Sequence, residues 1–381
     1  MKNSINILFA GDFAPCRRFE KIVLEKEEQV FGDLLPLIKN ADISFVNLEC
    51  SLTLCNKPIE KSGPPIKSDP KCIEALKSFS IIGLANNHVM DFDKKGLTDT
   101  LKACESINTP TVGAGTNLQE AQEFKIIEKD GFKLAIIALA EHEFNQADEH
   151  RAGSAPIDAI DNYHQIKQAK EQSDIVIVTL HAGNEYFPYP SPNARKLCKH
   201  YIDLGVEAVI CHHPHVPGAY EYYNKKPIFY SIGNFLFDNE KPPQDWDEGY
   251  MVDMEVDKDN KDIKNITLIP YNQSIEIGGL KHMENKEKEN FLKKIEDYRL
   301  LLENEKSYQR EWKTFVEKQA NSYILRQYVP NFFKGVGFLA KKISFVNLFL
   351  KSRNVLDKLN LIRCQSHHEL LKASLESKME K

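Results

Sequence analysis

The sequence predicts an α/β fold with a largely parallel β-sheet, and two patterns carry this prediction. Short, continuous apolar runs rich in β-branched residues are typical of strands buried on both faces. Such runs occupy residues 5–10, 43–46, 81–85, 134–139, 175–180 and 208–211. Stretches of helical periodicity lie between several of them, at residues 31–40, 70–78, 94–106, 160–172 and 193–204. This alternation favours parallel strands joined by helices.

The later part of the chain predicts a change of organisation near residue 283. Strand-like segments at residues 227–232, 249–256 and 263–269 close the α/β part. From residue 284 to about 328 the chain is charged and has helical periodicity, and Pro330 then interrupts the pattern. We therefore predict a first domain of residues 1–283 and a helical C-terminal extension of residues 284–381.

Two segments could contact other molecules. The connection of residues 56–69 has a length that often forms a lid or a substrate wall. Residues 331–363 mix apolar side chains with Lys and Arg, opposed only by Asp357. Such a basic amphipathic segment can make a peripheral membrane contact. The alternative is a helix pair that packs its apolar side onto the first domain, which the abundance of phenylalanine favours.

Composition excludes several classes of protein. A net charge of −5, spread over many charges of both signs, gives no basis for nucleic-acid binding. The 8 cysteines are scattered without a CxxC pair, which indicates buried free thiols in a reducing compartment. The four residues at the start and the six-residue apolar run that follows them are together too short for a signal peptide, and no run has the length of a membrane-spanning helix. We therefore expect a cytoplasmic protein. The basic segment 331–363 could in addition hold it at the membrane surface.

A polar cluster stands at the end of most of the predicted strands. The clusters are Gly11-Asp12, Asn47-Leu48-Glu49, Asn86-Asn87-His88 with Asp91, His181 to Glu185, and His212-His213-Pro214-His215. Ligands bind beyond the carboxyl ends of the strands in parallel sheets. The pattern therefore predicts that one rim of one sheet carries all of these side chains.

The individual clusters differ in strength as signals. Taken alone, Asp12 is better interpreted as a turn or helix cap, and His181 alone is compatible with a buried structural histidine. Asn47 and Glu49 have the two-residue spacing that points both side chains to one side of a strand end. Asp91, three residues after His88, could hold its ring in one tautomer.

The histidine cluster near residue 213 is the strongest signal. Pro214 separates His213 and His215, and in an extended segment this spacing aims both rings the same way. Taken together, the clusters offer carboxylates, an amide and imidazoles without thiolates. This set suits two divalent ions of manganese, iron or zinc, and such a pair typically serves hydrolysis.

At these residues the chain resembles the capsule-synthesis proteins of CapA type, which take part in poly-γ-glutamate capsule production and are similar to calcineurin-like metallophosphoesterases. The resemblance covers roughly residues 4–270. Its motifs are Gly11-Asp12, Asn47-Leu48-Glu49, residues 83–88 with Asp91, residues 181–186, residues 213–216 and residues 230–237. It implies a four-layer α/β/β/α sandwich with a dinuclear centre.

The resemblance also implies roles for single residues. Glu49 would bridge the ions, and His88 with Asp91 would supply the general acid. Asp12 and His215 would hold one ion, whereas Asn87, His181 and His213 would hold the other. Ala14 stands where these phosphoesterases carry a histidine, so the first ion would either be weakly held or have its ligands completed by Glu185, His212 or water. Asn47, Asn86 and Asn234 would contact the substrate or support the ligands.

Two functions follow as alternatives. The first is a dinuclear-metal hydrolase that acts on a phosphoester or an amide in a small molecule or polymer during capsule synthesis. The second is a non-catalytic, metal-binding assembly factor for a membrane-bound polymer synthase. The pair His88 and Asp91 favours the enzyme, because a binding protein has no need of an oriented acid. Ala14 favours the assembly factor.

Overall fold

The first three predicted strands lie in an eight-stranded mixed sheet. Its order is β18-β17-β16-β1-β2-β5-β6, and β15 also pairs with β1. β1, β2, β5 and β6 are parallel neighbours, whereas β16 to β18 continue the sheet in antiparallel fashion. The strands are β1 (Ser4–Ala14), β2 (Ile43–Leu48), β5 (Ile81–Gly83), β6 (Thr111–Val112), β15 (Asn234–Phe237), β16 (Glu248–Asp257), β17 (Ile263–Ser274) and β18 (Gly279–His282).

The other three predicted strands lie in a separate six-stranded sheet. Its order is β13-β14-β12-β11-β9-β8, with antiparallel pairing only at the two edges. The strands are β8 (Lys125–Lys129), β9 (Phe132–Ala140), β11 (Ile175–His181), β12 (Ala208–His212), β13 (Tyr220–Tyr223) and β14 (Lys226–Phe229). Two short pairs complete the strands, β3 (Ser51–Leu52) with β4 (Lys67–Ser68) and β7 (Ala114–Gly115) with β10 (Gly153–Ser154). The prediction of one sheet is therefore wrong, because the apolar runs divide between two.

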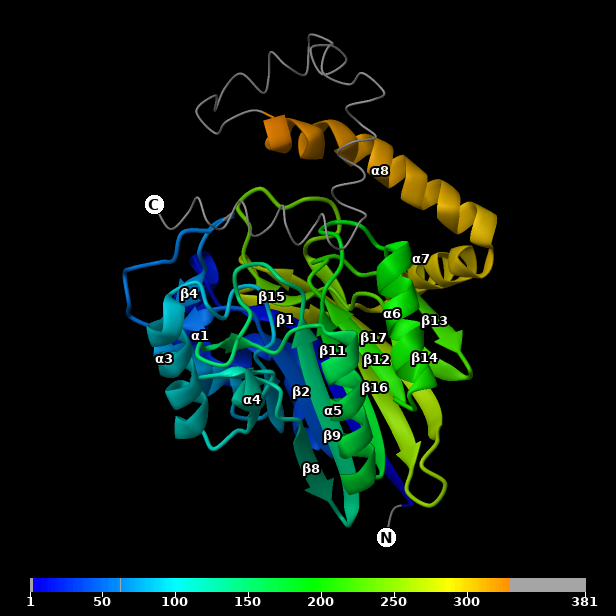
Figure 1. The fold of residues 1–381 in the computed structure, drawn as a ribbon, viewed down its shortest axis with the longest axis horizontal. Coiled ribbons are helices and arrows are strands. Elements are labelled where there is room, and N and C mark those ends of the chain that lie inside the picture. Colours follow the sequence, from blue (N-terminus) through cyan, green and yellow to red (C-terminus); the bar gives the residue numbers. More distant parts are fainter. Residues whose placement is uncertain (1–2, 62, 329–381) are drawn as a thin grey trace. The chain divides into compact units, whose positions relative to one another are not determined.

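The alternation of side chains along β1 shows how the sheets and helices are layered. Ile7 and Phe9 pack in a core with Ile136 and Ile177 of the six-stranded sheet. Leu8 points to the opposite face, into a second core built with the first helices of the chain. α5 and α6 lie against the outer face of the six-stranded sheet (Figure 1). The α/β sandwich implied by the resemblance is therefore confirmed.

Two of the predicted helices differ in the structure, and α1 (Arg18–Lys26) and α4 (Leu118–Ala121) were not predicted. The other helices are η1 (Glu27–Leu34), α2 (Leu35–Asn40), η2 (Pro70–Leu76), α3 (Asp93–Ser106), α5 (Ala159–Gln172), α6 (Pro192–Asp203), α7 (Asn285–Glu303) and α8 (Glu305–Tyr328). The helix predicted at residues 31–40 is broken, because Gly32, inside η1, has a φ of 53° and kinks the chain before α2. The helix predicted at residues 70–78 is a 3₁₀ helix that ends at Leu76.

This computed structural model describes residues 3–61 and 63–328, with side chains as far as residue 318. It divides the chain into two units, Met1–Tyr308 and Gln309–Lys381. α7 belongs to the first unit and buries Phe291 and Ile295 in the core between the sheets. The predicted boundary at residue 283 stays a prediction. The basic segment 331–363 and Pro330 lie outside the described residues.

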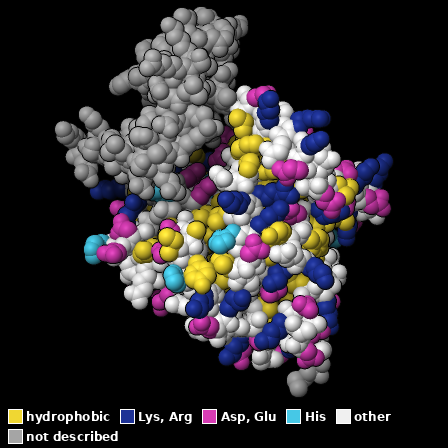
Figure 2. All heavy atoms as spheres, turned by 45° about the vertical axis from the view of Figure 1, so that its right-hand side comes forward, with side chains coloured by type: hydrophobic (Ala, Val, Ile, Leu, Met, Phe, Trp, Pro, Cys, Tyr) yellow, Lys and Arg dark blue, Asp and Glu magenta, His cyan; other side chains and the backbone are white. Residues whose placement is uncertain are grey.

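The surface carries charges of both signs (Figure 2), and most cysteines of the described part are buried. On the face drawn in Figure 2, Lys and Arg side chains are interspersed with Asp and Glu. The cysteines of the described part are free thiols, and all of them except Cys55 are buried. Within the described ranges, no helix is both long enough and apolar enough to cross a membrane. The predicted cytoplasmic location stays a prediction.

Candidate metal centre

The candidate centre lies where strands of both sheets end beside one another. Asp12 and Asn47 are register partners on the parallel strands β1 and β2. His181 and His212 are register partners on the parallel strands β11 and β12. Because parallel strands bring their carboxyl ends to the same edge, each sheet supplies a row of polar side chains.

β1 does not end before Asp12, as the sequence pattern predicted. The strand continues to Ala14, and its pairing with β2 and β15 shifts register at Asp12. Such irregularities re-aim a side chain within a strand. Gly11 makes this path possible, since a Cβ atom there would lie 2.1 Å from the Gly233 carbonyl oxygen.

Asp12 is buried within a set of hydrogen-bond donors. Its Oδ1 accepts a hydrogen bond from Asn47 Nδ2 at 2.7 Å, and its Oδ2 accepts one from the His213 amide at 3.1 Å. The ring atom Nδ1 of His212 lies 3.2 Å from Asp12 Oδ1. Burial favours a neutral carboxyl, but His212 and the other nearby rings outweigh it and lower the pKa of Asp12. Asp12 is therefore an anion at the edge of β1.

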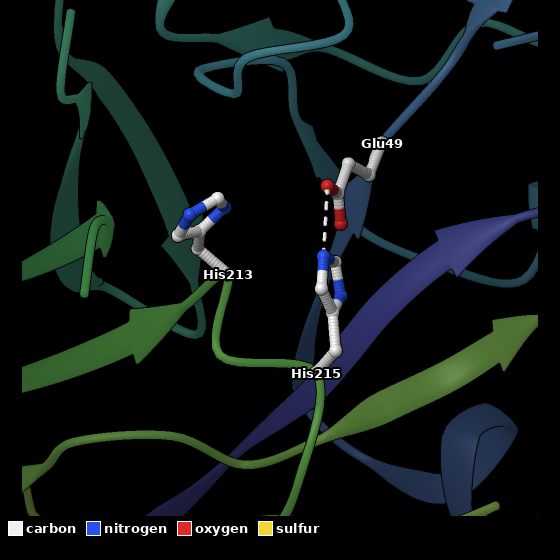
Figure 3. Close-up of side chains that lie close together, drawn as sticks. All are labelled: Glu49, His213 and His215. Carbon is white, nitrogen blue, oxygen red and sulfur yellow. Dashed lines mark ion pairs between the residues drawn. The ribbon is translucent and has the colours of Figure 1, made fainter. Parts of the chain in front are cut away.

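Glu49 has a different environment, although it lies close to the same rings. It is 0% exposed, and neither carboxylate oxygen has a hydrogen-bond partner within the described part. His181 Nε2 lies 3.3 Å from Glu49 Oε1, and His215 Nε2 lies 3.7 Å from it (Figure 3). Burial, assisted by the charge of Asp12, raises the pKa of Glu49 well above its usual value. A buried carboxylate without a partner is costly, and a bound cation would remove this cost.

His213 and His215 converge, but not through an extended segment. Both have positive φ angles, 94° and 62°, so the prediction that an extended backbone aims the rings is wrong. Such conformations are uncommon for residues other than glycine, and strain of this kind gathers at functional sites. Figure 3 shows both rings near Glu49, reached through a turn after β12.

Asn234 fixes the tautomer of His215. Both amide hydrogens of Asn234 can be donated, since Nδ2 lies 3.0 Å from the His215 carbonyl and 3.2 Å from that of Trp246. Its Oδ1 therefore accepts from His215 Nδ1 at 3.0 Å. The Nε2 lone pair of His215 then faces Glu49. Burial lowers the pKa of His215 to about 3, so the ring is neutral and able to bind a cation.

Asn87 and His181 form a further contact of the same centre. Asn87 Oδ1 lies 3.0 Å from His181 Nε2, and His181 Nε2 lies 3.2 Å from His213 Nδ1. Burial lowers the pKa of His181 well below its usual value, which leaves the ring neutral. Asn47 Nδ2 donates to His181 Nδ1 at 3.2 Å, and Asn87 Oδ1 can only accept, so the proton of His181 lies on Nε2. A cation bound through Nε2 would take the place of this proton.

The pair predicted from sequence spacing, His88 and Asp91, is formed. His88 Nδ1 lies 2.6 Å from Asp91 Oδ2, and the His88 amide donates to Asn86 Oδ1 at 3.1 Å. His88 Nε2 faces Glu49 Oε1 at 3.9 Å. Burial lowers the pKa of His88, although Asp91 opposes this effect. The ring is thus held next to the centre without being one of its convergent ligand groups.

Sequence reasoning missed three residues of the site. Glu141 and Glu143 follow β9, and their carboxylates lie 3.6 Å and 4.0 Å from His213 Nε2. Glu143 also accepts a hydrogen bond from Asn87 Nδ2 at 2.9 Å. Both glutamates could have been found, because they follow an apolar run as the other clusters do. Lys61, from the long connection, contacts Asp91 and carried no such signal.

Among the described residues, three groups of ligand atoms lie within 4.8 Å of one another. They are Glu49 with His213 and His215, Asp12 with Glu49 and His181, and Glu141 with Glu143 and His213. Glu185, by contrast, is exposed and belongs to none of these groups. The unpartnered Glu49 oxygens and the neutral imidazoles fit divalent cations such as manganese, iron or zinc.

The fold and this centre define an α/β sandwich protein with a candidate metal site between the ends of its two sheets. Residues 6–239 match the family described as bacterial capsule synthesis protein PGA_cap. The matched range is more than half of the chain, so the chain belongs to this family.

Curated relatives give the same result. The PGA biosynthesis protein CapA of Bacillus subtilis is 32% identical over 238 residues, which cover 60% of this chain and 62% of that protein. The capsule biosynthesis protein CapA of Bacillus anthracis is 31% identical over 246 residues, which cover 61% of this chain and 60% of that protein. A probable polyglutamine synthesis accessory protein of Mycobacterium tuberculosis is 27% identical over 227 residues, covering 55% and 60%. The chain thus spans less than two thirds of each relative.

Solved structures with distant similarity include two described as phosphoesterase or phosphatase. The calcineurin-like phosphoesterase YfkN from Bacillus subtilis has a TM-score of 0.45 and 12% identity, covering 82% of this chain and 98% of that chain. A novel phosphatase from Mycoplasma pneumoniae has a TM-score of 0.44 and 19% identity, and the match covers 71% of this chain and 94% of that chain.

Proposed function

We propose that this protein is a hydrolase that uses two divalent metal ions and acts on a phosphoester or amide bond during the synthesis of a capsule or another extracellular polymer. The polymer context comes from the family and from the names of the relatives. The chemistry comes from the arrangement of side chains between the sheets.

A single observation carries the proposal. The Glu49 carboxylate is fully buried and lacks a hydrogen-bond partner, although the Nε2 atoms of His181 and His215 lie 3.3 Å and 3.7 Å from its Oε1. A fold that needed Glu49 only for stability would pair it with a donor. Bound cations would account for the absence of such a donor.

The roles proposed for the residues are those that the resemblance to metallophosphoesterases implies. One ion would be held by Asp12, His215 and Glu49, and the other by Glu49, Asn87, His181 and His213. When bound, the ions would lower the pKa of a water molecule and stabilise negative charge on the substrate.

His88 would move the proton. Its Nδ1–H donates to Asp91, so the neutral ring carries its lone pair on Nε2, the atom nearer Glu49. Nε2 can therefore accept a proton and afterwards deliver it to a leaving group. Acting as an acid requires the ring to take up this second proton first.

Metal content and turnover test the proposal together. We expect about two ions per chain after loading with manganese, iron or zinc, measured by elemental analysis. Hydrolysis should appear in a panel of phosphomonoesters, phosphodiesters and γ-glutamyl peptides. His88→Ala should keep its metal and lose about 10²- to 10⁴-fold in turnover. A chain that binds no metal would refute the proposal.

An assembly factor for a polymer synthase is the second candidate. Ala14 favours it, because a buried methyl group adds no ligand beside Asp12. The name of the Mycobacterium tuberculosis relative, which describes an accessory protein, also favours an assembly factor. In that case the partner would be a capsule synthase. One ion per chain, no turnover on the panel and copurification with a synthase would support this alternative.

Association with a membrane remains a separate proposal. It concerns residues 331–363, which lie outside the described residues, and electrostatic attraction of their Lys and Arg to anionic lipid would drive it. The full chain should sediment with anionic vesicles at low salt and be released at high salt.

A further inference from the structure

Lys61 is a buried ammonium group in the long connection between β3 and β4. Its side chain is only 3% exposed, and the Asp91 carboxylate that it meets is 0% exposed. A buried charge is costly unless it is paired and hydrogen-bonded. The position of Lys61 is therefore specific, unlike that of a surface lysine.

The contacts of Lys61 all fall on the cluster that contains His88. Its Nζ lies 2.5 Å from Asp91 Oδ1 and donates to the Asn87 carbonyl oxygen at 3.1 Å. It also lies 3.4 Å from His88 Nδ1. A residue of the connection thus reaches the backbone and side chains next to the candidate centre.

Asp91 joins the connection to the His88 ring. One of its carboxylate oxygens, Oδ2, receives both His88 Nδ1 and the Ile66 amide, each at 2.6 Å. The Ile59 amide donates to the Asp91 carbonyl oxygen at 2.9 Å. The connection is therefore attached to Asp91 on both sides of Lys61.

We propose that Lys61 is a positioning residue, which fastens residues 59–61 and 66 to Asp91 and thereby holds the His88 ring beside the metal centre. The part of this proposal that concerns turnover rests on the proposed function. Lys61 pairs with Oδ1 of Asp91, while Oδ2 of the same carboxylate orients His88. The Lys61 contact therefore fixes the carboxylate that in turn fixes the ring.

Lys67 provides a matched control from the same connection. Its Nζ donates to the Cys55 carbonyl oxygen at 2.7 Å and to Asn56 Oδ1 at 2.6 Å, and it lies over the Phe92 ring. These are local contacts that do not reach Asp91. Methionine at either position keeps the apolar stem and removes the ammonium group.

The first test does not depend on turnover. In Lys61→Met, the amides of Ile59 and Ile66 should exchange with solvent at least about tenfold faster than in the parent, because their acceptor residue is no longer fixed. The downfield proton resonance of the His88–Asp91 hydrogen bond should broaden or vanish, and His88→Ala identifies that resonance. Lys67→Met should leave all three signals unchanged. Unchanged exchange and an intact resonance in Lys61→Met would overturn the proposal.

The second test separates positioning from general stability. Lys61→Met should keep the metal content of the parent and lose about 10- to 100-fold in turnover, the usual effect of removing a supporting residue. In a His88→Ala background the same substitution should change turnover less than about twofold, because its effect passes through His88. An equal loss in both backgrounds would show a structural role instead. A parent without any turnover would refute the proposed function, while the exchange and resonance data would still decide the contact of Lys61.

Discussion

Replacing Glu49 with glutamine should stabilise the metal-free chain and destabilise the metal-loaded chain relative to the parent. Burial and Asp12 raise the pKa of Glu49, so the folded chain without metal holds a carboxyl group that resists ionisation. An unsatisfied buried polar group costs about 1–3 kcal/mol, and a charged one costs more. Glutamine has nearly the same shape and no charge. We therefore expect the metal-free variant to gain about 1–3 kcal/mol at neutral pH.

The effect of Glu49→Gln on stability should change from stabilising to destabilising once metal is bound. A ligand at a thousand times its dissociation constant stabilises the folded state by about 4.1 kcal/mol. Glutamine cannot bridge two cations as a carboxylate does, so the variant should lose most of this gain. The metal-loaded parent should then be the more stable chain.

The pH dependence gives an independent check on the metal-free chains. The folded-state pKa of Glu49 is raised, so its contribution to stability is present below the ordinary value of 4.5 and is lost as the pH rises toward the folded pKa. The advantage of Glu49→Gln should therefore grow with pH above that value.

Urea unfolding, carried out once with a chelator and once with saturating manganese, measures the change in unfolding free energy of the variant in both states. The exposed Glu128 gives the control, since Glu128→Gln should stay within about 0.5 kcal/mol of the parent in both conditions. If Glu49→Gln were destabilised equally with and without metal, Glu49 would have a protein partner, and the reasoning would be refuted.

Three further predictions address the support of the centre and the fold. Glu143→Ala should weaken metal binding about 10- to 100-fold by calorimetry, because Glu143 orients the Asn87 amide, whereas Glu149→Ala should not change it. Gly11→Ala should destabilise the chain by about 1–3 kcal/mol in urea, because the new methyl group meets the Gly233 carbonyl; unchanged stability would contradict the close approach. Arg195 and Tyr230 lower the pKa of Glu221 despite its burial, so Glu221→Gln should cost about 1.5–3 kcal/mol near neutral pH, and this cost should shrink as the pH falls below 4.5 through the lower folded pKa. A pH-independent cost would show that the charge of Glu221 is not involved.

The strands could be predicted because burial on both faces requires a continuous run of apolar residues, which is visible in the sequence. Each predicted run lies in a strand or at its end, and the side chains that follow the runs reach the centre. The division into two sheets left no comparable trace. Parallel strands with two buried faces look alike in either sheet, and only the pairing of β2 with β1 and of β11 with β9 decides it.

The parts of the site that could not be predicted depend on contacts that are distant in sequence or on unusual backbone angles. The convergence of His213 and His215 was predicted, but the positive φ angles that achieve it were not, because nothing in their residue types requires them. Lys61 lies in a polar connection where most lysines are solvated. Its burial becomes meaningful only when Asp91, 30 residues later, is placed beside it.

The two-sheet arrangement also explains how the centre can contain groups that weaken the fold. Asp12 and Glu49 come from the eight-stranded sheet, whereas His181, His213 and His215 come from the six-stranded sheet and its following turn. Buried carboxylate oxygens without donors and strained histidines each oppose folding. The apolar core between the sheets, which is independent of these side chains, holds both sets in place. A cation bound between them would then relieve the cost locally and link the sheets, so metal binding should raise the stability of both sheets together.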